Sequence, residues 1–145
     1  MKVEQLFFNV KAVNIVFDNI IYSKEKQGGI SNYWYEITKG FSKDENVAFY
    51  EEKNSIENIF RKKLSITNTI NHKDIPLILA RLLPIKFTGS TESVLYHSSF
   101  YRKLISKAAV CEVTTVHDFL QVVHAPLLRR LMHNRLKYAS IRRAK

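Results

Sequence analysis

The sequence has 145 residues, which is enough for one domain with one hydrophobic core. Hydrophobic residues make up 46% and aromatic residues 12% of the chain, so the composition is globular and excludes an intrinsically disordered protein. The single cysteine, Cys111, excludes a disulfide framework, and we expect it to be a small buried residue at a strand edge. No run approaches the roughly 18 apolar residues of a membrane-spanning helix and no secretory signal follows Met1, so the sequence predicts a cytoplasmic protein.

The net charge of +10 is concentrated near the end of the chain. Asp118 is the last acidic residue, and residues 124–145 carry seven lysines or arginines. This excess favours anionic partners, which are nucleotide phosphates, a nucleic acid or an anionic membrane surface. The same segment predicts a helix that either packs on the sheet or makes a peripheral contact with the inner face of a membrane. Its apolar stripe consists of Leu128, Leu131, Met132, Leu136 and Ala139.

The first predicted elements are a strand and a helix joined by a loop with two glycines. Residues 13–18 are a short apolar run rich in β-branched residues, which is typical of a strand buried on both faces of a parallel sheet. We expect Ser31 to cap the following helix, with Tyr33 and Trp34 facing the core and Tyr22 and Tyr35 free to face a cleft or solvent. The helix is predicted from the spacing of Ile30, Tyr33, Trp34, Ile37 and Phe41.

Strands and helices continue to alternate along the rest of the chain. The predicted strands cover 46–52, 94–99 and 113–116, and the predicted helices cover 55–64, 72–84, 100–107 and the C-terminal basic segment. This order predicts an α/β fold of the Rossmann-like type, with three α/β/α layers, a mostly parallel sheet and helices on both faces.

In such a sheet, ligands bind outside the carboxyl ends of the strands. The loop after the first strand holds Gly28 and Gly29, His97 and Ser98 end a later strand, and His117 and Asp118 follow the "VTTV" strand. We therefore expect these polar groups to converge on one edge of the sheet, together with Tyr22. The remaining histidines, His72, His124 and His133, are expected to be solvated.

The double glycine has two interpretations. Glycine lets a ligand approach the main chain, and the loop leads into a helix whose first N–H groups attract anions, so it can hold a phosphate. The alternative is an ordinary turn from strand to helix, because Gly28 and Gly29 match neither the dinucleotide-binding motif nor the Walker motif.

The pair of His117 and Asp118 also has two interpretations. A histidine at this position can hydrogen-bond sugar hydroxyls or phosphate oxygens and can exchange a proton near neutral pH. The alternative is that His117 ends the strand and Asp118 caps the next helix. His97 either lines the same cleft or is half-buried beside Tyr96. No spacing of cysteines and histidines predicts a metal site.

Four stretches of the sequence carry a resemblance to a known family. They are "VNIVFDNIIYSKEKQGGISNYWYEITKGF", "VLYHSSFYRKL", "VTTVHDFL" and "LKYASIRRA". Together they resemble the N-terminal half of family 4 glycosyltransferases, which are retaining enzymes of the GT-B fold. The likeness covers nearly the whole chain from about residue 13, and residues 1–12 are an N-terminal extension that precedes the place where the family begins.

The resemblance implies a role for each edge residue. In that family an N-terminal domain holds a glycan or lipid-linked acceptor and a C-terminal domain holds the nucleotide-sugar donor. The family's glycine loop faces the donor diphosphate and acceptor and matches Gly28 and Gly29, and its strand-end histidine, near the transferred sugar, matches His117, with Asp118 beside it. The fold requires no metal and no cofactor, because helix dipoles and basic side chains offset the charge of the leaving diphosphate.

The resemblance ends before the donor-binding domain, so residues 13–145 are expected to form an acceptor-side domain that is incomplete at its C-terminus. Three hypotheses follow. The chain is the acceptor half of a polysaccharide-building transferase that needs a donor domain supplied separately, or it is an inactive remnant or glycan-binding module. The third hypothesis, a small nucleic-acid-binding α/β domain, is not expected because the basic residues form no recognisable reading motif.

Overall fold

The computed structural model describes residues 14–71, 75–88, 92–117 and 126–144. The expected N-terminal extension, residues 1–12, therefore lies outside the described residues, as does Asp118.

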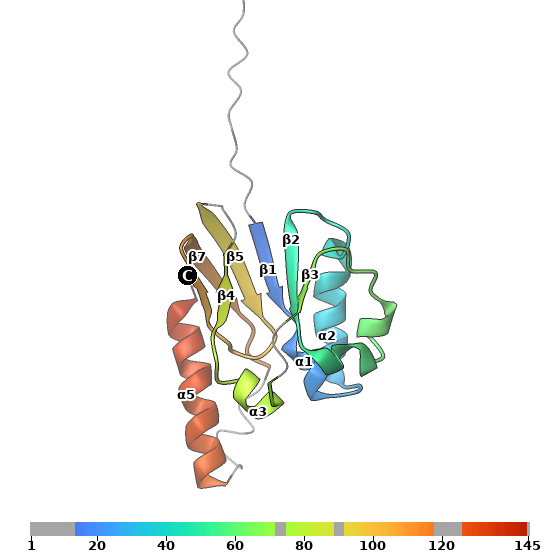
Figure 1. The fold of residues 1–145 in the computed structure, drawn as a ribbon. Helices are drawn as coiled ribbons and strands as arrows, with labels where there is room; N and C mark the ends of the chain where they lie inside the picture. The colour runs from blue at the N-terminus through green and yellow to red at the C-terminus, as the bar shows by residue number, and fades with distance from the viewer. Residues whose placement is uncertain (1–13, 72–74, 89–91, 118–125, 145) are drawn as a thin grey trace, which may run out of the picture.

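A five-stranded sheet forms the centre of the molecule (Figure 1). Its strands are β1 (Asn14–Asp18), β2 (Val47–Glu51), β3 (Thr69–Asn71), β5 (Ser93–Ser98) and β7 (Ala109–Thr114). They lie in the order β3-β2-β1-β5-β7, and every neighbouring pair is parallel. The predicted α/β, Rossmann-like fold with a mostly parallel sheet is confirmed.

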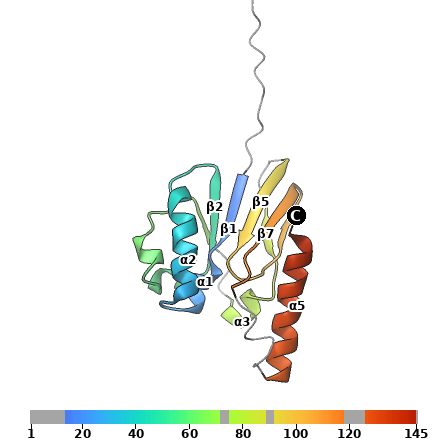
Figure 2. The ribbon, with the colours of Figure 1, turned by 180° about the vertical axis from the view of Figure 1, so that it is seen from behind.

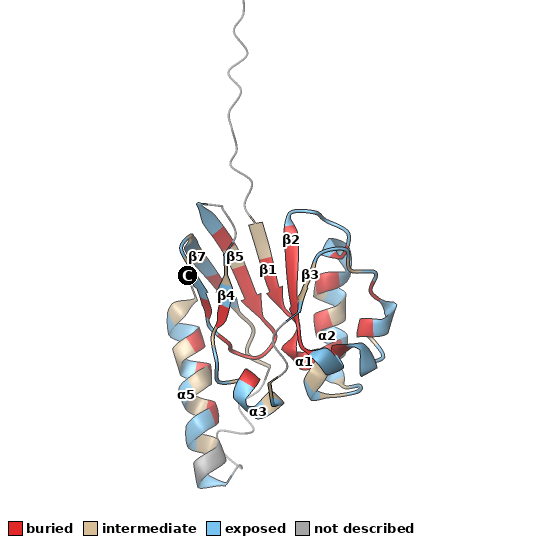
Figure 3. Cartoon of the chain, viewed as in Figure 1, coloured by how far each residue is buried: buried red, intermediate tan, exposed pale blue. Residues whose placement is uncertain are grey.

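Alternate residues of β1 face opposite sides of the sheet and build two cores, as a strand with both faces buried requires. Phe17 points toward Trp34 of helix α2 (Gly29–Thr38), and their rings meet edge to face at 5.8 Å. Val16 points to the other face and packs with Ile85 and Leu104. Figure 3 shows the buried residues concentrated along these central strands.

The second face is covered by a small parallel sheet, where we had expected a helix. It consists of β4 (Ile85–Phe87) and β6 (Leu104–Ser106). The predicted helix over 100–107 is therefore wrong, because Leu104 enters the core as part of a strand and Arg102 is bound by carboxylates. Tertiary contacts have outweighed the local helical pattern.

Short helical pieces replace the two other helices expected in the middle of the chain. The segment 55–64 contains two 3₁₀ turns, Lys53–Glu57 and Arg61–Lys63, and the segment 72–84 contains only α3 (Leu77–Ala80), with residues 72–74 outside the described part. A short helix α1 (Ile20–Lys24) was not predicted, and the helix predicted to reach Phe41 ends in a 3₁₀ turn (Lys39–Phe41). Isolated turns of this kind have few apolar repeats, so periodicity does not reveal them.

Helix α5 (Leu127–Arg143) lies beside β7 at one border of the sheet, as the two opposite views in Figures 1 and 2 show. Its predicted helical structure is confirmed, but His133 is buried against Phe100 and Tyr101, which contradicts the expectation that it is solvated. Cys111 is exposed on β7, so the expectation that it is buried is wrong. Within the described ranges, we find no helix with the length and apolar character needed to cross a membrane.

Candidate functional site

The carboxyl ends of β1 and β5 meet in a buried ion pair. Asp18, the last residue of β1, accepts hydrogen bonds from Ser98 Oγ at 2.8 Å and from Arg102 Nε at 2.8 Å. Both Asp18 and Arg102 are fully buried. Ser98 also accepts hydrogen bonds from the backbone N–H groups of Phe100 and Arg102, so it fixes the turn that carries the arginine.

Arg102 joins this pair to the end of β2. Its Nη1 donates to Glu52 Oε1 at 2.6 Å and to the carbonyl oxygen of Ala80 at 3.1 Å. Burial by itself lowers the pKa of Arg102, but the carboxylates of Asp18 and Glu52 raise that pKa above its ordinary value. The guanidinium is therefore a permanent cation, buried at the carboxyl ends of β1 and β5, where an open parallel sheet commonly binds its ligand.

A second buried polar group lies at the ends of β1 and β2. Asn19 donates to Glu51 Oε1 at 2.8 Å and accepts from Trp34 Nε1 at 2.8 Å. Glu51 also holds Arg61 through both of its carboxylate oxygens. These contacts fix helix α2 against the sheet edge, and every one of the four side chains is buried.

His97, near the end of β5, lies between α2 and the loop that follows β7. Its ring meets that of Trp34 edge to face at 4.8 Å, and its Nε2 lies 2.9 Å from Thr115 Oγ1. Burial, followed by the nearby positive form of His117, lowers the pKa of His97 to about 4. His97 is therefore a neutral, buried imidazole at physiological pH.

His117 lies within the same group of side chains. Its ring packs edge to face against Tyr33 of α2, with 5.3 Å between the ring centres. Tyr33 is 42% exposed, so the expectation that it faces the core is wrong, whereas the same expectation is confirmed for the fully buried Trp34. The structure thus brings together His97, His117 and Tyr33 from three separate segments, as parallel strands with a common carboxyl edge allow.

The loop with Gly28 and Gly29 leads into helix α2 at the carboxyl edge of the sheet. The helix begins at Gly29, with Gly28 in extended conformation as its N-cap, so Ser31 lies inside the first turn and is not the cap. The Glu25 carboxylate accepts a hydrogen bond of 3.0 Å from the backbone N–H of Ser31. This position at a helix start favours an anion, and here the chain's own carboxylate occupies it.

Only one of the two glycines lies close to another side chain. A Cβ atom at position 28 would lie 2.6 Å from Oε1 of Glu25, whereas a Cβ atom at position 29 would meet nothing within 4 Å. The loop is also tied to the next segment, because Asn58 Nδ2 donates to the Glu25 carbonyl oxygen at 2.8 Å and Ile59 N–H donates to the Lys26 carbonyl oxygen at 3.0 Å. The loop is therefore held in place by these hydrogen bonds, and the space beside Gly29 is open.

Two predicted substrate-binding residues have structural contacts instead. Tyr22 is buried and its hydroxyl lies 3.4 Å from Thr38 Oγ1, so the expectation that it faces a cleft or solvent is wrong. Burial raises the pKa of Tyr22 to about 12. Ser98 is buried and bound to Asp18, which places it in the ion-pair network.

Sequence reasoning missed the buried polar network as a whole. Acidic residues directly after two apolar runs, in "VFD" and "FYEE", were the available signal, because a carboxylate at a buried strand end needs a partner. The partners are distant in sequence and no periodicity reveals them. The missed residues are Asp18, Asn19, Glu51, Glu52, Arg61, Arg102 and Thr115.

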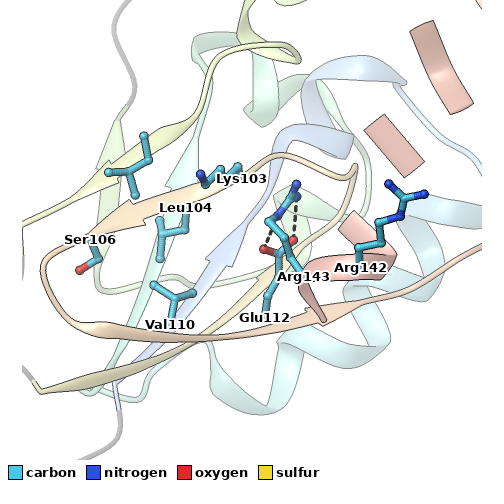
Figure 4. A pocket seen from close by; sticks show the side chains of 8 residues that line it. Lys103, Leu104, Ser106, Val110, Glu112, Arg142 and Arg143 are labelled. Atoms are coloured by element: carbon cyan, nitrogen blue, oxygen red, sulfur yellow. Dashed lines mark hydrogen bonds and ion pairs between the residues drawn. The ribbon is translucent and has the colours of Figure 1, made fainter. Parts of the chain in front are cut away.

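A cavity of about 470 Å³ lies away from this edge, between β6, β7 and the last turn of α5 (Figure 4). Arg143 binds Glu112 with both Nε and Nη2, at 2.8 and 2.9 Å. The other two cations of the lining, Lys103 and Arg142, leave this part of the surface basic. The lining consists of Lys103, Leu104, Ile105, Ser106, Val110, Glu112, Arg142 and Arg143.

No protein-family model, curated protein or solved structure matches the chain. Across the described ranges, no group of three or more histidine, cysteine or acidic side chains is arranged to hold a metal ion.

Proposed function

We propose that this chain is the acceptor-side domain of a sugar transferase of the GT-B type, which works with a donor-binding domain that closes the cleft. The observation that carries the proposal is the meeting of Tyr33, His97 and His117 at the carboxyl edge of the sheet. These side chains come from α2, β5 and the loop after β7. Tyr33 supplies an aromatic ring and His117 an imidazole, groups that can pack against a sugar ring and bind its hydroxyls, and His97 packs behind them against Trp34.

Around His97 and the strand-end arginines, the edge offers hydrogen-bonding groups more than free charge to an acceptor. His97 is uncharged at pH 7, and the arginines at the strand ends, Arg61 and Arg102, are bound by Glu51, Glu52 and Asp18. A glycan acceptor needs hydrogen bonds and an aromatic surface, not a net charge. The sequence resemblance adds the assignment of His117 and Asp118 to the transferred sugar and of Gly28 and Gly29 to the donor diphosphate.

In this proposal, donor binding changes which anion lies at the start of α2. The donor diphosphate replaces the Glu25 carboxylate near the first N–H groups of α2, which the open surface at Gly29 permits. The donor itself is held by the complementary domain, so we expect this chain alone to bind acceptor sugars and to transfer none.

The test is a titration of the full chain with a panel of oligosaccharides, followed by amide chemical shifts. We expect saturable shifts for Tyr33, Thr115 and His117, and a loss of affinity of about tenfold in both Tyr33→Ala and His117→Ala. Tyr138→Ala is the matched control, because Tyr138 is 45% exposed but lies on α5. Adding a separately produced family 4 donor-binding domain and a nucleotide sugar should then produce transfer that His117→Ala abolishes.

The proposal fails if no oligosaccharide gives saturable shifts, or if Tyr138→Ala weakens binding as much as Tyr33→Ala. Binding without transfer, in the presence of a competent donor domain, would favour the glycan-binding module. Micromolar binding of a DNA duplex that weakens steeply with salt would favour the nucleic-acid hypothesis instead.

A further inference from the structure

Helix α5 packs on the sheet through its polar side. Ser140, which is buried, donates to Glu112 Oε1 at 3.0 Å and lies 2.7 Å from Thr114 Oγ1. Lys137 and His133, one and two turns earlier on the same face, are also buried. The contact with β7 is thus made by hydrogen bonds and the Arg143 ion pair, which reverses the usual orientation of a helix on a sheet.

Another side of α5, roughly a third of a turn around the helix from the buried side, is apolar and exposed. At about 100° per residue, four side chains fall within an arc of roughly 80°, interrupted by Asn134. We call them the outer stripe, and they are Leu127, Leu131, Tyr138 and Ile141. Leu131 is 59% exposed. An apolar row of this length on a helix surface is typical of an interaction site.

The charges beside the outer stripe are all positive. Arg130 lies on one side, and Arg135 and Arg142 lie on the other. The helix carries six arginines or lysines and no acidic residue. The cavity at its last turn adds Lys103 to the same basic surface.

We propose that the outer stripe of α5 docks on an anionic lipid surface. Leucine and isoleucine enter the boundary of the acyl chains, Tyr138 lies at the level of the headgroups, and the flanking arginines bind lipid phosphates. We favour a lipid surface over other partners because its negative charge complements the arginines beside the outer stripe. A second copy would bring the same set of cations against itself, in a chain whose net charge is +10, and would be repelled.

A second exposed apolar group lies near the start of α5. Ile78, Leu79, Leu82 and Leu83, in and after α3, are exposed. Phe100 links the two helices, because it packs with Ala80 of α3 and with His133 of α5. This link runs through the buried side of α5, so these side chains are not counted as part of the outer stripe.

The test is co-sedimentation of the full chain with vesicles of one part phosphatidylglycerol to two parts phosphatidylcholine. We expect binding that weakens with salt and is largely absent with pure phosphatidylcholine. Leu131→Glu should lower the partition coefficient by about tenfold or more. Ile56→Glu is the matched control, because Ile56 is also 59% exposed but lies far from α5 in the chain, and it should leave binding unchanged.

A second pair of variants tests the charges. Arg135→Gln with Arg142→Gln should lower binding to the anionic vesicles by about tenfold or more, whereas Lys43→Gln with Lys62→Gln, which removes the same charge elsewhere, should have a much smaller effect. Equal effects of the two pairs, equal effects of Leu131→Glu and Ile56→Glu, or equal binding to neutral vesicles would overturn the proposal. A dimer that Leu131→Glu converts to a monomer would also overturn it, because the occupant would then be a second copy.

Discussion

The indole N–H of Trp34 donates a hydrogen bond of 2.8 Å to the side-chain oxygen of Asn19, the residue that follows β1. The side-chain amide of Asn19 also donates a hydrogen bond to Glu51, at the end of β2. A single side chain of α2 thus fixes the helix against the ends of two strands. The helix in turn carries Tyr33 and the Gly28 and Gly29 loop, so the geometry of the candidate edge depends on this hydrogen bond.

Trp34 and Tyr33 are neighbours in sequence, but we expect their substitutions to differ sharply in stability. Trp34→Ala removes a fully buried ring and leaves Asn19 without its donor, so the free energy of unfolding should fall by about 3–5 kcal/mol. Tyr33→Ala removes a ring that is half-exposed and should cost about 1 kcal/mol or less. Urea unfolding followed by far-UV circular dichroism measures both. Equal losses would contradict the orientation of α2 described above.

The buried ion pair of Arg102 and Asp18, at the carboxyl ends of β1 and β5, gives a second prediction. Arg102→Met leaves the Asp18 carboxylate buried without its cation, and the free energy of unfolding should fall by about 3–5 kcal/mol. Asp18→Asn with Arg102→Met removes both charges of this pair and leaves only Glu52 without its cation, so it should recover part of that loss. Arg135→Met, at an exposed position, should change stability by about 0.5 kcal/mol or less. If the double variant is less stable than Arg102→Met, the ion pair is not the source of the loss.

Strands β1, β2 and β5 could be predicted from the sequence because their signal is local. The predicted strand 113–116 overlaps only the end of β7, and β3, β4 and β6 were not predicted. Val16 and Phe17 belong to a continuous apolar run, and a run of this kind predicts a strand buried on both faces without knowledge of its partners. The predicted positions of β2 and β5 are confirmed for the same reason. Their parallel order then follows from the alternation with helices, and with it the common edge at which His97 and His117 lie.

The features that could not be predicted depend on contacts between residues that are distant in the sequence. Arg102 is separated from Asp18 by 84 positions, and the segment around it forms a strand and an ion pair although its spacing resembles a helix. Helix α5 was predicted correctly as a helix, but its orientation is set by Glu112 and Thr114 of β7, which bind its polar side. An apolar stripe predicts the buried side only where the neighbouring element is also apolar.

The carboxylate at the start of α2 gives a third prediction. Glu25→Ala removes a charge-assisted hydrogen bond to Ser31 N–H and a favourable contact with the helix dipole, so it should cost about 1 kcal/mol. Glu36→Ala, on the exposed side of the same helix, removes only a surface pair with Lys39 and should cost about 0.5 kcal/mol or less.

The contact between Gly28 and Glu25 can be tested in the same background. Gly28→Ala should displace the Glu25 carboxylate and cost a similar amount, but it should have a smaller effect when Glu25 is already alanine. Thermal unfolding of the two single variants and the double variant completes the cycle. Fully additive losses would show that the carboxylate does not lie against Gly28.

The lowered pKa of His97 makes stability depend on pH in a known direction. The unfolded chain binds a proton at this imidazole near pH 6.5, whereas the folded chain does so only near pH 4. Between these values the unfolded state holds more protons, so stability is complete above pH 6.5 and is lost as the pH falls toward 4. From pH 7 to pH 5 this group should contribute a loss of about 2 kcal/mol.

His97→Gln isolates that contribution from the other groups that titrate in the same range. The loss of stability between pH 7 and pH 5, measured by urea unfolding, should be about 2 kcal/mol smaller in His97→Gln than in the original chain. Thr115→Val removes the hydroxyl that lies beside His97 Nε2, but because burial is the larger cause of the lowered pKa, it should leave most of the pH dependence in place. If Thr115→Val removes the pH dependence as completely as His97→Gln, the hydrogen bond and not the burial keeps His97 neutral.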